Sequence, residues 1–115
     1  MSTGAPAWHV AASAAADADY DEILSWTAQH FGRAQAVKYS KIIDDAVAAL
    51  RLGPERVGVK SLSHIGAGIF SLHIARVGRR DRHVLIFRAN RRKRKIEVLR
   101  ILHDSMDIAR HLTEE

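Results

Sequence analysis

The densest group of chemically active side chains is a run of five consecutive cations, Arg91-Arg92-Lys93-Arg94-Lys95, with Arg88 and Arg100 nearby. Arginine binds phosphate through two parallel hydrogen bonds and keeps its proton at physiological pH. The run, here called the basic patch (residues 91–95), therefore predicts a site for an anionic partner. No aromatic residue interrupts it, so base stacking is poorly provided for and direct nucleic-acid binding is expected to be secondary. The alternative is a solvated turn, kept charged so that its strands do not pair with other molecules.

Three histidines, His73, His83 and His103, lie on or at the ends of strand-like segments. Imidazole binds metals and transfers protons near neutral pH. No H-x-x-x-H pair accompanies these residues, so we expect no metal site and no cofactor. Gly66-Ala67-Gly68 precedes a strand rather than a helix, which argues against a phosphate-binding loop. The chain has no G-x-S-x-G turn to support a serine hydrolase.

Charge is unevenly distributed along the chain. Residues 1–50 carry three basic and six acidic side chains, whereas residues 51–115 carry fifteen basic and seven acidic ones, for a net charge of +5. Eleven of the basic residues and only two acidic ones lie within 76–100. Such a concentration of positive charge favours an anionic partner, which is a nucleic acid, an acidic protein segment or an anionic membrane surface.

The length of 115 residues suits one domain, and 47% hydrophobic with 27% charged residues is an ordinary globular balance. The absence of cysteine excludes a disulfide scaffold and a thiol nucleophile, and it fits a reducing compartment. The chain has no apolar run of membrane-spanning length, and no secretory signal opens it. We therefore expect a cytoplasmic protein without membrane association. Residues 1–7 are expected to be a loose tail, 8–112 the single domain and 113–115 its C-terminal end.

The hydrophobic period changes once along the chain. Helical spacing covers 14–31 and 33–52, separated by Gly32, with Ser13 suited to cap the first helix and Gly53-Pro54 to end the second. Beyond residue 55, a loop is expected first and then alternation typical of three strands; a short apolar run near Trp8 supplies a fourth. The expected segments are a loop at 55–68, strands at 69–74, 83–89 and 96–103, and a weakly helical end at 104–112.

The predicted fold class is therefore α+β, with a helical hairpin on one face of a four-stranded antiparallel sheet in the order β-α-α-β-β-β. The second face of the sheet is expected to stay open. The helical stripes and one side of the strands should form the core, made of Ile23, Leu24, Phe31, Ile42, Ile43, Val47, Leu50, Phe70, Leu72, Ile74, Leu85, Phe87, Leu99 and Ile101.

The last strand ends in Leu-His and is followed by Met-Asp-Ile and Arg-His-Leu, within residues 96–112. With Ser-Ala-Ala-Ala-Asp at 13–17 and with Trp26 and Phe31-Gly32, this pattern resembles the RelE/ParE superfamily of type II toxin–antitoxin toxins, in particular its ParE branch. The resemblance implies a RelE-like fold and a toxin that a cognate ParD-like antitoxin, often with an acidic tail, holds in check. ParE-type toxins are associated with poisoning DNA gyrase, and RelE-type toxins cut messenger RNA on the ribosome.

The two branches differ in the side chains that they need. RNA cleavage requires groups that activate the 2′-hydroxyl, stabilise the phosphorane and protonate the leaving oxygen. Several ribonuclease relatives place a tyrosine near the C-terminus, whereas the tyrosines here are Tyr20 and Tyr39. We therefore expect a gyrase inhibitor with no catalytic residue. The alternatives are a non-toxic basic module that binds nucleic acid or protein, and a ribosome-dependent endoribonuclease that would use His103, Arg100, Arg88 and Arg76.

The C-terminal strand and tail supply the expected target-binding residues, which are Arg100, His103, Met106, Arg110 and His111. Cations together with one flexible apolar side chain suit a protein interface. The alternative role of this segment is to dock the tail on the sheet, and a docked tail can also carry a binding surface.

Overall fold

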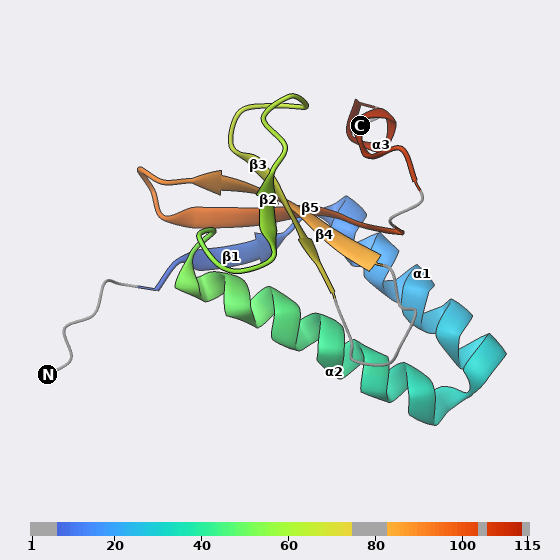
Figure 1. Ribbon diagram of the computed structural model, residues 1–115. Helices are drawn as coiled ribbons and strands as arrows, with labels where there is room; N and C mark the ends of the chain where they lie inside the picture. Colours follow the sequence, from blue (N-terminus) through green and yellow to red (C-terminus); the bar gives the residue numbers. More distant parts are fainter. Residues whose placement is uncertain (1–6, 75–82, 104–105, 114–115) are drawn as a thin grey trace, which may run out of the picture.

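A helical hairpin covers one face of a five-stranded sheet in the computed structural model, which describes residues 7–74, 83–103 and 106–113 (Figure 1). The sheet order is β1-β5-β4-β3-β2. The elements are β1 (His9–Ala12), α1 (Ala14–Phe31), α2 (Arg33–Ala49), the 3₁₀ turn η1 (Leu50–Leu52), β2 (Val59–Ser61), β3 (Ile69–His73), β4 (His83–Asn90), β5 (Lys95–His103) and α3 (Ile108–Thr113). The α+β class and the helical hairpin are thus confirmed.

The sheet differs from the expected four antiparallel strands in both number and direction. β2 lies within the segment expected to be a loop and pairs antiparallel with β3. It is three residues long and has one half-buried position, so it leaves no alternation to detect. β1 runs parallel to β5, with His9 opposite Lys95 and Ala12 opposite Val98. The backbone N–H of Ser13 also donates to the Val98 carbonyl. The contact with β5 therefore continues up to the residue at which α1 begins.

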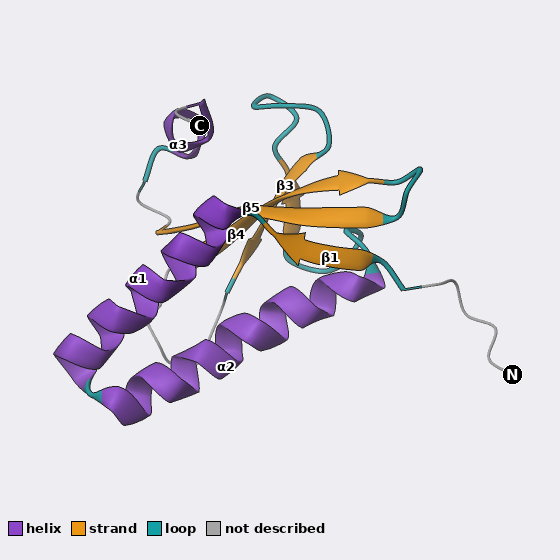
Figure 2. Cartoon of the chain, turned by 180° about the vertical axis from the view of Figure 1, so that it is seen from behind, coloured by secondary structure: helices purple, strands orange, loops and turns teal. Residues whose placement is uncertain are grey.

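Ser13 fixes the start of α1 on the sheet. Its hydroxyl accepts a hydrogen bond from the Ala16 N–H at 3.0 Å and donates to the Leu99 carbonyl of β5 at 2.9 Å. Gly32 ends the helix with φ at 93°, a conformation that favours glycine, and its N–H donates to the Ala28 carbonyl. The two helices spread apart from this turn, as Figure 2 shows.

Replacing Ser13 by Ala is expected to lower the free energy of unfolding by about 1–2 kcal/mol, because both the cap and the link to β5 are lost. Urea denaturation measures the change. Ser25→Ala is the matched control, because Ser25 is exposed within the same helix and its replacement should change stability by less than about 0.5 kcal/mol. Equal stability of the two variants would contradict the anchoring role of Ser13.

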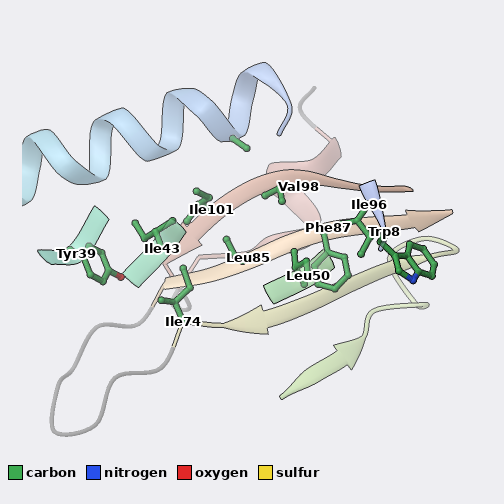
Figure 3. Packing of buried hydrophobic residues seen from close by; sticks show 11 residues of the cluster. Trp8, Tyr39, Ile43, Leu50, Ile74, Leu85, Phe87, Ile96, Val98 and Ile101 are labelled. Atoms are coloured by element: carbon green, nitrogen blue, oxygen red, sulfur yellow. The ribbon is translucent and has the colours of Figure 1, made fainter. Parts of the chain in front are cut away.

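Two apolar clusters lie on opposite faces of the sheet. The helix-side core is shown in Figure 3 and consists of Trp8, Ala16, Tyr39, Ile43, Leu50, Ile74, Leu85, Phe87, Ile96, Val98 and Ile101. The second cluster comprises Ile69, Val84, Ile86, Leu99 and Leu102, with Leu62, Ile65, Ile108 and Leu112 packed against it. The expectation of an open second face is therefore wrong. Because β4 is apolar on both sides, both of its faces are covered.

Two residues of the expected core lie elsewhere. Phe31 is 65% exposed, because it lies at the end of the hairpin. Leu99 belongs to the second cluster and Ile101 to the helix-side core because β5 bulges between them: Phe87 pairs with Val98 but Ile86 pairs with Arg100, which leaves Leu99 as an extra residue. A bulge of one residue shifts the alternation of all later side chains. No helix in the described part of the chain is both long and apolar enough to cross a membrane.

Candidate functional site

Arg100 joins three elements of the fold. Its Nε and Nη2 donate to the two carboxylate oxygens of Asp19 on α1, at 2.8 and 3.0 Å. The Ile101 N–H donates to the same carboxylate at 2.9 Å, and Arg100 Nη1 donates to the His111 carbonyl at 3.4 Å. The side chains of Arg100 and Asp19 are only 19% and 14% exposed. This expected target-binding cation therefore stabilises the fold of its own chain.

His103 lies beside another histidine. Its ring meets that of His83 edge to face, with centroids 5.6 Å apart, and His83 Nδ1 lies 2.7 Å from the Tyr39 hydroxyl. Tyr39 is 4% exposed, so this tyrosine supports His83 from the core side. Sequence reasoning missed this group. Counting pairs back from the Asn90–Lys95 pair places His83 opposite Leu102, and only the bulge brings it opposite His103.

The tail divides into exposed and half-buried members. Met106 is 43% exposed and Arg110 is exposed, whereas His111 is half-buried. Asp107 begins the last helical turn: its carboxylate accepts from the Arg110 N–H at 3.2 Å, and its carbonyl lies 2.9 Å from His111 Nδ1. The described tail thus presents Met106 and Arg110 on the surface.

Of the four residues named for ribonuclease action, the three that the structure describes are not gathered at one place. Arg88 is exposed on β4 opposite Glu97, and His103 is opposite His83 at the far end of the same strand pair. At about 3.4 Å per residue, these positions are roughly 17 Å apart. Arg100 is bound to Asp19 between them, and Arg76 lies outside the described residues.

The basic patch forms the turn between β4 and β5, but its cations are not equivalent. Arg94 has φ at 53°, its guanidinium lies 5.1 Å from the centre of the Trp8 ring, and its carbonyl accepts from the His9 N–H. Arg91 forms an exposed ion pair with Glu55 at 3.2 Å. Arg92, Lys93 and Lys95 are exposed. Arg94 therefore holds β1 in place, and the other side chains present the positive charge.

A groove of about 420 Å³ opens between the spread helices, and no motif or spacing in the sequence predicts it. Its walls are mainly apolar, with Val10 and Ala12 contributed by the edge strand β1. Two acidic residues, Asp17 and Asp44, and one basic residue, Arg51, line it, and all three are exposed. Burial raises the pKa of Tyr20 in this groove, and hydrogen bonding to Asp44 and the negative charge of Asp44 raise it further. The groove is therefore an apolar cleft whose lining has one more acidic than basic side chain.

A family model described as the ParE toxin of the type II toxin–antitoxin system parDE matches residues 10–108. The chain is similar to a solved chromosomal ParDE toxin–antitoxin system from P. aeruginosa, with 23% identity, a TM-score of 0.65, and coverage of 84% of this chain and 95% of that one.

It is also similar to a chain of the RelBE2 toxin–antitoxin complex from Mycobacterium tuberculosis, with 22% identity, a TM-score of 0.56, and coverage of 87% and 94%. At these identities the two structures support the fold. A comparison with curated protein sequences gave no match. The family match over most of its length shows that this chain belongs to the ParE toxin family of type II toxin–antitoxin systems.

Proposed function

We propose that this chain is a toxin that inhibits DNA gyrase by binding it and that a cognate ParD-like antitoxin neutralises the toxin. Membership of the ParE family supports the toxin role. The observation that carries the binding mechanism is the double hydrogen bond from Arg100 to Asp19. A guanidinium that serves a phosphorane must be directed at the reacting phosphate. Arg100 points at Asp19 of α1 instead, so its charge stabilises the fold rather than a reacting phosphate.

The second candidate function is ribonuclease action, and one observation favours it. His83 and His103 lie side by side, and a buried tyrosine hydroxyl holds one of them. Two imidazoles of this kind can act as an acid and a base. If the chain is a gyrase inhibitor, Tyr39, His83 and His103 only pack together, where α2, β4 and β5 meet.

Purified protein is expected to block DNA supercoiling by gyrase, and His103→Gln should retain that inhibition within about threefold. Glutamine keeps polarity and similar length but cannot transfer protons. A translation assay that follows messenger RNA cleavage serves as the counter-measurement. Cleavage of the message that falls by about 100-fold in His103→Gln, together with unaffected gyrase, would establish the ribonuclease instead.

Two surfaces suit the antitoxin. β1 is an edge strand, and its residues Val10 and Ala12 also line the groove, so an added peptide strand would place side chains there. The exposed cations of the basic patch suit an acidic tail. Because coupled folding buries apolar surface, calorimetry with the antitoxin should give a negative change in heat capacity.

Arg92→Glu is expected to weaken antitoxin binding by about threefold or more and to reduce its dependence on salt. Lys60→Glu is the matched control, since Lys60 is an exposed cation on β2 outside the basic patch. Isothermal titration at two salt concentrations makes the comparison. Equal losses in both variants would mean that the toxin attracts the antitoxin through net charge rather than through this turn.

A further inference from the structure

The end of the helical hairpin carries an exposed aromatic group. Trp26 and Phe31 are 53% and 65% exposed, and Val37, on the first turns of α2, is 62% exposed. The His30 ring stacks on Trp26 with centroids 4.1 Å apart, and Phe31 meets Trp26 edge to face at 5.7 Å. His30 Nδ1 also lies 2.8 Å from the Trp26 carbonyl. We call residues 26–38 the hairpin tip.

Packing among the described residues leaves Trp26, Phe31 and Val37 of the hairpin tip exposed. Figure 2 shows that the helices carry it well away from the sheet. Trp26 and Phe31 are therefore ordered against each other without contributing to either apolar cluster. Exposed tryptophan with neighbouring apolar side chains is typical of an interaction surface, because burial of such residues dominates binding energy.

The charge of the hairpin tip indicates what it binds. Residues 26–38 include no acidic residue but contain Arg33 and Lys38. A partner must therefore offer an apolar cleft that carries negative charge. The groove at the other end of the same hairpin has an excess of one acidic side chain, because Asp17 and Asp44 line it with Arg51, and the rest of the lining is mainly apolar. Its volume of about 420 Å³ is in the range of sites that enclose whole ligands, so it has room for an aromatic side chain.

We propose that two copies of this chain associate, with the hairpin tip of each seated in the groove of the other. A two-fold axis between antiparallel hairpins makes both contacts at once, so the assembly closes as a dimer. An aromatic side chain of the hairpin tip enters the apolar cleft, and the tip cations face Asp17 and Asp44. The dimer covers the groove that the proposed antitoxin surface includes, so self-association and antitoxin binding compete.

The test uses the toxin alone, so its result is independent of gyrase inhibition and of any antitoxin. Sedimentation velocity of the wild type should show a monomer–dimer equilibrium that depends on concentration. Trp26→Ala and Phe31→Ser should each weaken dimerisation by about tenfold or more, since both residues are central in the contact. Val57→Ser is the matched control: Val57 is 98% exposed, and it belongs neither to the tip nor to the groove. Circular dichroism confirms that each variant is folded.

A charge exchange tests the pairing itself. Arg33→Glu makes the tip repel the groove of an identical copy, and Asp44→Lys does the same from the side of the groove. Each variant alone should dimerise at least about tenfold more weakly than wild type. An equimolar mixture should recover the dimer, because both contacts are then of opposite charge.

The fluorescence of Trp26 supplies a second measurement. Trp8 is buried in the monomer, at 7% exposed, so dimerisation changes its surroundings little. A blue shift of tryptophan emission with rising protein concentration therefore reports burial of Trp26.

Three outcomes would overturn the proposal. The first is a wild type that stays monomeric at every concentration. The second is a dimer that Trp26→Ala leaves unchanged, and the third is a charge-exchanged mixture that stays monomeric. A monomeric wild type in which Trp26→Ala instead weakens binding of antitoxin or of gyrase would assign the hairpin tip to that partner.

Discussion

Replacing Met106 by Ser and Arg110 by Glu together is expected to reduce gyrase inhibition by about 100-fold or more, with the fold retained. Both side chains are exposed on the tail, and neither belongs to the second apolar cluster. They are the expected target-binding residues that the structure leaves on the surface. Their loss removes the flexible apolar side chain and reverses one charge of the interface. A supercoiling assay titrated with each protein measures the effect.

The control for this variant is Arg92→Glu, which reverses an equally exposed charge on the basic patch. It should leave gyrase inhibition within about threefold of wild type while weakening antitoxin binding. Unchanged inhibition by the Met106/Arg110 variant would remove the tail from the target interface. Loss of inhibition in both variants would point to general positive charge rather than to the tail.

Deletion of the tail is a poorer test than these point substitutions. Ile108 and Leu112 of α3 pack against the second cluster. A shortened chain would expose that apolar face and lose stability, so a loss of inhibition would have two causes. The substitutions at Met106 and Arg110 leave this packing in place.

The helical hairpin could be predicted because local signals agree over its whole length. Ser13 caps α1, Gly32 supplies the positive φ of the turn, and Gly53, with φ at 103°, follows the last 3₁₀ turn. Such signals act between residues close in sequence, so a single sequence displays them. Phe31 fits the same helical stripe, but the stripe does not say where the sheet beneath it ends. The exposure of Phe31 could therefore not be predicted from the helical spacing of apolar residues.

The errors in the sheet have a different origin, because each depends on pairing across the chain. The bulge at Leu99 is visible only in the register between β4 and β5. The direction of β1 depends on Val98, which is more than eighty residues away. The same limit applies to the candidate site. Arg100 and His103 could be chosen from their residue types, but their partners, Asp19 and His83, lie on other elements.

Replacing Asp19 by Ala is expected to lower the free energy of unfolding by about 2–4 kcal/mol, a loss reduced from the fully buried case by the partial exposure of the pair. The substitution removes the carboxylate that accepts hydrogen bonds from Arg100 and from the Ile101 N–H. Asp21→Ala is the matched control, since Asp21 is exposed two residues further along α1 and should change stability by less than about 0.5 kcal/mol.

A double-mutant cycle with Arg100→Met isolates the ion pair from the loss of either side chain. Arg100→Met should also destabilise, because it leaves the Asp19 carboxylate largely buried without its cation. The double variant removes both charges, so its loss of stability should fall short of the sum of the single losses by about 1–3 kcal/mol. Chemical denaturation of the four proteins gives this coupling energy. Additive losses would mean that Asp19 and Arg100 act independently, and the pair would then not be what ties α1 to β5.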